Sequence, residues 1–112
     1  MNALDMTQVE AVLQQAREQA QQAAQETYSR IGERDACGFA WVRVYDVRIN
    51  SKLGKALVSA GFRKAWDRGL ELWNPSQHNT QSISVKEAGA YAYAEVLRNA
   101  GIEKAYAGSR MD

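Results

Sequence analysis

CGFAWVRVY, residues 37–45, has the alternating pattern of a half-buried β-strand. Its even positions carry small and β-branched residues, Ala40, Val42 and Val44, which suit a sheet face packed under a helix. Its odd positions carry larger side chains: Phe39, Trp41, Arg43 and Tyr45. Because successive side chains of a strand point to opposite faces, the odd face must either be covered by another element or be used for binding.

This strand is expected over residues 38–47. Further helices and strands are predicted after it. Helices are predicted at 52–60, capped by Ser51, and from a Ser84–Glu87 capping box to about residue 100. Strands are predicted at 62–66, 70–73 and 104–107, with a hairpin turn at 67–69 and a tail at 108–112. The order β-α-β-β-α-β with right-handed crossovers predicts a ferredoxin-like domain, a four-stranded antiparallel sheet with two helices on one face.

The first third of the chain has the pattern of one long helix. A Thr7–Glu10 capping box opens it and Gly32 ends it. Its apolar positions recur with helical spacing: Val9, Leu13, Ala16, Ala20, Ala23, Ala24, Tyr28 and Ile31. Because alanines contribute little burial, this helix would be marginal in isolation. We expect it to dock on the odd face of the sheet or, as the alternative, on a second copy of the chain in a homodimer.

The composition is that of an ordinary globular protein, and the order of the predicted elements places the chain in the α+β class. Residues 1–36 are expected to form the helix and its connector, and residues 37–112 the α+β domain, within one compact unit. No apolar run approaches the roughly 18 residues of a membrane span, and no export signal is visible at the start. With a single cysteine, Cys37, the sequence predicts a cytoplasmic protein that does not contact a membrane.

Charge is unevenly distributed, although the net charge is only +1. Residues 37–69 contain seven basic and two acidic side chains, whereas residues 1–36 contain three and six. The basic residues of this middle segment form a candidate interaction or phosphate-binding set: Arg43, Arg48, Lys52, Lys55, Arg63, Lys64 and Arg68. Such a set favours phosphates or an acidic protein surface, and the alternative is an ordinary solvated face.

No residue spacing in the chain indicates catalysis or metal binding. His78 is the only histidine and has no cysteine or histidine near it, so a zinc site is not expected. Cys37 is predicted to be a small buried core residue. The sequence therefore predicts a non-enzymatic protein without a cofactor or metal.

Aromatic residues of the first strand suggest a way to bind nucleic acid. Residues 37–44 resemble the aromatic octapeptide of RNA-recognition motifs at Gly38, Phe39, Ala40, Trp41 and Val42. Cys37 replaces the basic residue of that motif and Val44 its last aromatic residue, and that family carries the peptide on its third strand. The resemblance implies base stacking on Phe39 and Trp41. Trp73, which ends another predicted strand before a polar loop, is a third candidate aromatic anchor.

Five segments carry a second resemblance: CGFAWV (37–42), KLGK (52–55), LWNPS (72–76), VKEAGA (85–90) and GSRMD (108–112). Through them the chain is similar to a group of small, uncharacterised bacteriophage proteins. This resemblance implies an accessory protein acting in the host cytoplasm. Small phage proteins of this kind often inhibit host defence, as anti-CRISPR proteins do.

Two functions are therefore expected. The first is binding of a host protein or nucleoprotein, with Trp73 and the basic residues at the interface, because Trp and Arg often dominate such interfaces. The alternative is direct binding of nucleic acid or a nucleotide by the basic segment 43–68, with Phe39 and Trp41 as stacking platforms.

Overall fold

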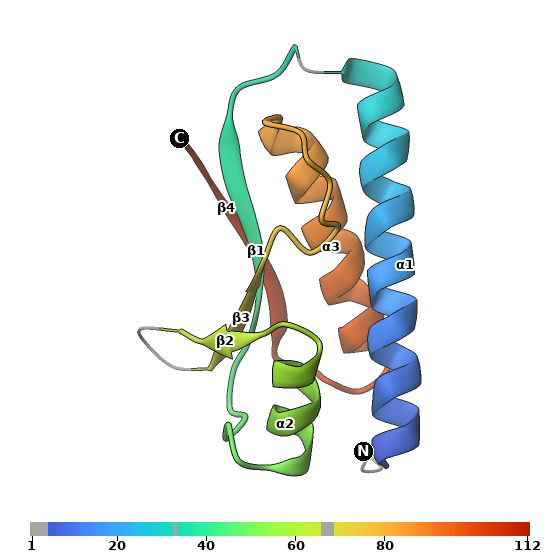
Figure 1. The fold of residues 1–112 in the computed structure, drawn as a ribbon, viewed down its shortest axis with the longest axis vertical. Helices are drawn as coiled ribbons and strands as arrows, with labels where there is room; N and C mark the ends of the chain where they lie inside the picture. Colours follow the sequence, from blue (N-terminus) through green and yellow to red (C-terminus); the bar gives the residue numbers. More distant parts are fainter. Residues whose placement is uncertain (1–4, 33, 66–68) are drawn as a thin grey trace.

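The alternating residues after position 37 form a central strand in the computed structural model, which describes residues 5–32, 34–65 and 69–112 (Figure 1). In chain order the elements are α1 (Met6–Ile31), β1 (Gly38–Val44), α2 (Lys52–Ser59), β2 (Arg63–Lys64), β3 (Leu70–Trp73), α3 (Ile83–Asn99) and β4 (Ala105–Met111). The protein is therefore α+β with a long N-terminal helix, as the sequence predicts.

The strands form one open antiparallel sheet in the order β2-β3-β1-β4. In the middle of the sheet, Trp41 of β1 lies opposite Trp73 on β3 and Gly108 on β4. The even residues of β1 are fully buried and the odd residues only partly buried, which confirms the predicted alternation.

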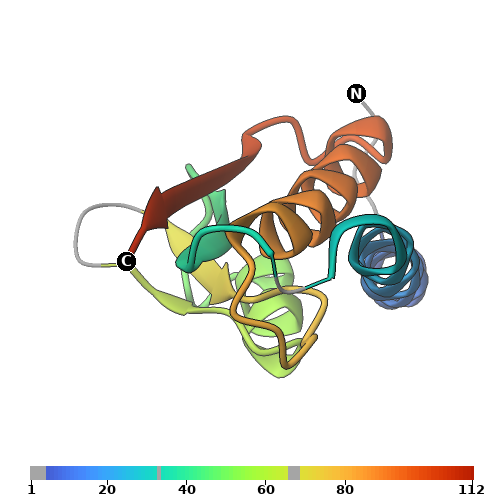
Figure 2. The ribbon, with the colours of Figure 1, turned by 90° about the horizontal axis from the view of Figure 1, so that it is seen from above.

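Helix α3 covers one face of the sheet by packing on β1 and β4, and α1 packs on the far side of α3 and on α2 (Figure 2). The apolar stripe of α1 is buried in this position: Val9, Leu13, Ala16, Ala20 and Ala24. The expectation that the N-terminal helix covers the odd face of the sheet is therefore wrong. Small residues allow α1 to pack on α3 instead: Ala16 and Ala20 are fully buried there, and the Cβ position of Gly89 on α3 is in van der Waals range of the Ala20 carbonyl oxygen.

Both long helices begin at a different cap from the one the sequence predicts. The Asp5 carboxylate accepts a hydrogen bond from the Gln8 amide, and the Gln8 side chain accepts one from the Asp5 amide. The cap is therefore two residues before the predicted Thr7, and α1 begins at Met6. In α3, the Ser82 hydroxyl rather than that of Ser84 caps the helix, because it accepts the Val85 amide. Both corrections lengthen the helix at its N-terminal end.

Strand ends also differ from the predicted bounds. β1 ends at Val44 rather than at residue 47, and β2 has only two residues. β4 continues to Met111, so most of the predicted tail pairs with β1. Residues 67 and 68 of the predicted hairpin turn lie outside the described residues.

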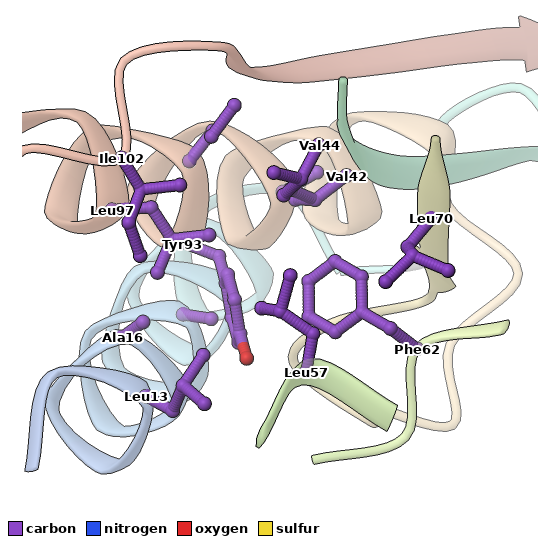
Figure 3. Close-up of a cluster of buried hydrophobic side chains, with 14 of the residues drawn as sticks. Leu13, Ala16, Val42, Val44, Leu57, Phe62, Leu70, Tyr93, Leu97 and Ile102 are labelled. Carbon is purple, nitrogen blue, oxygen red and sulfur yellow. The ribbon is translucent and has the colours of Figure 1, made fainter. Parts of the chain in front are cut away.

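The hydrophobic core fills the space between the sheet, α3, α2 and the inner face of α1 (Figure 3). Its largest fully buried side chains are Tyr93, Phe62, Leu57, Leu70 and Leu97. Residues of α1 and of the region after position 37 share this one core. Within the described part of the chain, no helix is both long and apolar enough to cross a bilayer.

Candidate functional site

The face of the sheet opposite α3 is not covered by any helix of the described residues (Figure 2). Cross-strand pairing places the odd residues of β1 on this face together with their partners on the neighbouring strands. We call this surface the open face; its side chains are Phe39, Trp41, Arg43, Arg63, Glu71, Trp73, Tyr106 and Arg110. Because they come from four hydrogen-bonded strands, the sheet itself fixes their spacing.

Three aromatic rings form a contiguous cluster on the open face. The Trp41 and Trp73 ring centroids are 5.0 Å apart, and those of Phe39 and Trp73 are 5.8 Å apart in an edge-to-face arrangement. Such offset and edge contacts are the favourable geometries for aromatic pairs. Trp73 nevertheless remains 45% exposed, so the cluster has an aromatic surface available to solvent. The structure thus brings together the three aromatic residues that the sequence singled out.

Gly108 of β4 lets the Trp41 indole lie against the sheet. A Cβ added to Gly108 would stand 2.5 Å from Trp41 Nε1 and 2.7 Å from Trp41 Cε2, closer than real Cβ contacts. Only a residue without a side chain leaves room for the indole at this position. The ring is therefore held in place by its neighbours Gly108 and Trp73 rather than projecting into solvent.

Arg43 is held at the centre of the open face by Glu71. Its Nε and Nη2 atoms each lie 3.1 Å from Glu71 Oε2, and both side chains are less than one-fifth exposed. The Arg43 guanidinium carbon also lies 5.7 Å from the Trp41 ring centroid, in cation–π range. The local charge of Arg43 is thus balanced by Glu71, and its role on this face is to brace Trp41.

Phe39 is flanked by two cations at the end of the aromatic cluster. The Arg110 guanidinium carbon lies 5.8 Å from its ring centroid, and Lys86 Nζ lies 5.5 Å from it. Lys86 is nearly buried and donates a hydrogen bond of 2.9 Å to the Gly38 carbonyl oxygen. Arg110 is exposed, so its guanidinium can reach a ligand that stacks on Phe39.

The basic residues predicted as one interaction set are divided among three places. Arg43 and Arg63 are on the open face, across the strands from Glu71. Arg48 and Lys64 line a shallow hollow beside the β1–α2 connection. Lys52 and Lys55 are exposed on α2, and Arg68 lies outside the described residues. At the start of α2 the Ser51 hydroxyl accepts a hydrogen bond from the Gly54 amide, which confirms the predicted cap.

Tyr106 and Arg110 are open-face residues that sequence reasoning missed. Arg110 falls in the predicted tail, and Tyr106 in a strand predicted to end at residue 107. In the structure β4 pairs with β1 along all seven of its residues, with Arg110 opposite Phe39 and Tyr106 opposite Arg43. The signal was present in the chain, because Tyr106, Gly108 and Arg110 recur with the period of two expected for one face of a strand.

His78, in the polar loop after β3, has a structural role. His78 Nδ1 accepts a hydrogen bond of 3.2 Å from the Thr80 amide, and its ring centroid lies 4.7 Å from that of Tyr28 on α1. Cys37 is exposed, contrary to the expectation of a buried thiol. Among the described residues, no three His, Cys, Asp or Glu side chains gather closely enough to hold a metal ion.

The chain was also compared with known proteins. No protein-family model, curated protein or solved structure matches it. Its function is therefore inferred from the surfaces described above.

Proposed function

We propose that this chain is a non-enzymatic binding protein whose open face binds single-stranded nucleic acid. The observation that carries this proposal is the uncovered cluster of Phe39, Trp41 and Trp73, flanked by the exposed guanidinium of Arg110. An aromatic cluster of this size contributes nothing to the core between the sheet and the helices, so its presence on the surface calls for a ligand.

Stacked bases fit the dimensions and chemistry of this face. Neighbouring strands lie about 4.8 Å apart, so the distance from β3 to β4 allows two or three unstacked bases to lie across the sheet. Each base stacked on an aromatic ring contributes about 1–3 kcal/mol. Arg110 beside Phe39 and Arg63 at the β2 edge would meet phosphates on either side of the cluster. A duplex cannot offer its base faces in this way, which favours a single strand.

We also propose that the region after α1 is a ferredoxin-like domain. The element order β-α-β-β-α-β and the central position of β1 next to β4 support this arrangement. The sheet of RNA-recognition motifs has the same general architecture, but here the aromatic segment is on the first strand rather than the third. The proposal for nucleic acid therefore rests on the side chains of the open face and not on that resemblance.

The second candidate ligand is a host protein or a nucleoprotein. Trp73 favours it, because a Trp that is 45% exposed and packed on Phe39 and Trp41 has the character of a binding hot spot. Together with the resemblance to small phage proteins, it leads to the proposal of a phage accessory protein that inhibits host defence in the host cytoplasm. A homodimer through α1 would require its stripe to leave α3, where Ala16 and Ala20 are fully buried.

The test is fluorescence anisotropy with a labelled single-stranded oligonucleotide of about 10 nucleotides at low and high salt. We expect Trp73→Ala to weaken binding about tenfold or more, since one stacking partner is lost. Tyr91→Ala is the matched control, because Tyr91 is an exposed aromatic residue on α3, away from the open face. Arg110→Gln should lower the slope of log affinity against log salt by about 1.

Two further results separate the proposals. Lys52→Gln combined with Lys55→Gln should leave the affinity nearly unchanged, because both residues are on α2 rather than on the open face. If this pair weakens binding and Trp73→Ala does not, the site is the basic segment and not the open face. If the wild-type protein binds no single strand even at low salt, the nucleic-acid proposal fails and the host-protein proposal becomes the one to test.

A further inference from the structure

A cavity of about 310 Å³ lies on the helix side of the molecule, away from the open face. Its walls come from α1, α2, α3, β3 and the loop after β3, through residues that include Leu13, Arg17, Ala56, Leu72, Gln77 and Tyr93. This volume is at the lower end of the range found for small-molecule sites. The apolar side chains form much of the wall, while Arg17 and the Tyr93 hydroxyl supply polar groups.

The Tyr93 hydroxyl reaches this cavity, although the rest of the side chain is buried. Tyr93 is only 1% exposed, and its ring packs on Phe62 with 5.9 Å between centroids. Its oxygen points into the space between α1 and α2, near Leu13 and Leu57 (Figure 3). It forms no hydrogen bond with any residue that the structure describes. The hydroxyl can therefore donate a hydrogen bond to a ligand that occupies the cavity.

The hydroxyl keeps its proton at physiological pH and can therefore act only as a donor or a neutral acceptor. Burial raises the pKa of Tyr93 to about 12, and the nearby positive charge of Arg17 offsets only part of this rise. A ligand atom next to Tyr93 should therefore be a hydrogen-bond acceptor, such as a carboxylate or phosphate oxygen.

Arg17 provides the charge that such an acceptor needs. Its guanidinium lies against the loop after β3, where Nη2 is 3.4 Å from the Gln77 side-chain oxygen. Among residues 5–32, 34–65 and 69–112 it forms no ion pair. Most of its five N–H donors thus remain available for an anion. Glu10, two turns earlier on α1, also lines the cavity, and its negative charge would keep an anionic group at the Arg17 end.

We propose that this cavity is a binding site for a small organic anion, a carboxylate or phosphate ester on a compact apolar body. The anionic group contacts Arg17 and accepts a hydrogen bond from Tyr93, and the body packs on Leu13, Ala56 and Leu72. The site is independent of the open face, because its walls belong to the helix side of the sheet.

The test is NMR titration of the whole chain with three probes: benzoate, phenyl phosphate and the neutral benzamide. We expect benzoate or phenyl phosphate to bind in the millimolar range and to shift the Tyr93 ring and Arg17 side-chain signals. Benzamide should bind at least about tenfold more weakly, because a hydrogen bond to a charged group is worth more than a neutral one. Whichever anion binds tighter identifies the source of the anionic group.

Two variants with matched controls locate the site. Arg17→Gln should weaken anion binding at least about tenfold, and Tyr93→Phe by about fivefold, since the ring remains and only the hydroxyl is lost. Arg30→Gln on the same helix and Tyr91→Phe on α3 should leave the affinity unchanged, because neither residue lines the cavity. Arg17 is exposed, so its variant stays folded even if Tyr93→Phe does not. The proposal is overturned if neither anion binds, if benzamide binds equally well, or if Arg17→Gln retains wild-type affinity.

Discussion

The two faces of β1 differ in the size of their side chains, and the larger ones are on the face without a cover. Ala40, Val42 and Val44 are fully buried beneath α3, whereas Phe39 and Trp41 are on the open face and only partly buried. A fold selected for stability alone would place its largest apolar rings in the core. The covered face therefore holds the molecule together, and the open face is the one that we propose for recognition. Variants on each face should therefore affect different measurements.

The largest effect on stability is expected from the covered side. Leu97→Ala removes a fully buried side chain of α3 and should lower the free energy of unfolding by about 3 kcal/mol, through lost burial and the cavity that remains. Urea denaturation followed by circular dichroism measures this change. Trp73→Ala on the open face should cost only about 1 kcal/mol, because nearly half of that side chain is already exposed. If both variants lower the free energy of unfolding equally, the two faces do not differ in their contribution to stability.

Sequence patterns predict well which residues of an element are buried. They do not predict which other element covers those residues. The alternation of β1 and the spacing of Val9, Leu13 and Ala16 in α1 both identified buried positions correctly. An apolar stripe does not identify the element on which it packs, however, and α1 packs on α3 and α2 rather than on the sheet. The reason is the match of small residues, with Ala20 facing Gly89, which is visible only once both helices are placed.

Pairing between distant segments explains the part of the candidate site that the sequence did not reveal. Phe39, Trp41 and Trp73 were expected as aromatic anchors from local composition. Arg110 falls in the predicted tail, because the last strand is predicted to end at residue 107. The hydrogen bonds of β4 to β1 extend the strand beyond that residue.

A smaller stability effect should follow from crowding the contact between α1 and α3. Ala20 is fully buried there, so Ala20→Leu has no space for its added atoms and should destabilise the protein by about 2 kcal/mol. Ala11→Leu is the control, because Ala11 is exposed on the same helix, and its effect should be within about 0.5 kcal/mol. Thermal and urea unfolding of both variants provide the measurement. A neutral Ala20→Leu would mean that α1 is not packed closely on α3 in solution.

Gly108→Ala tests whether the position of Trp41 matters to the open face. The added Cβ would stand 2.5 Å from Trp41 Nε1, so the indole must move at a cost of about 1 kcal/mol. We expect a changed tryptophan emission spectrum and weaker binding of a single strand. In a Trp41→Ala background the same substitution should cost little, because there is no indole left to displace. A substitution that costs the same in both backgrounds would show that Trp41 does not rest on Gly108.

The smallest expected effect is a pH dependence at the start of α3, away from the open face. The Asp35 carboxylate accepts hydrogen bonds from the Ser84 amide at 2.7 Å and the Ser82 hydroxyl at 2.9 Å. The bonds to Ser84 and then to Ser82 lower the pKa of Asp35 to about 2 from its ordinary value of 3.8. The carboxylate of Asp35 thus binds a proton more tightly in the unfolded chain than in the folded one. Its contribution to the free energy of unfolding is therefore present above about pH 4 and is lost as the pH falls toward 2.

Asp35→Asn should therefore reduce stability at neutral pH and flatten the dependence of Tm on pH between about 4 and 2. The matched control is Asp112→Asn, because Asp112 is an exposed carboxylate at the end of the chain. Thermal unfolding at closely spaced pH values measures the difference between the two variants. Binding at neutral pH should be unaffected in both, since the side-chain hydrogen bonds of Asp35 go to Ser82 and Ser84 rather than to a residue of the aromatic cluster. A loss of binding with Asp35→Asn would mean that the stability of the covered side and recognition by the open face are coupled, and the simple division between the two faces would no longer hold.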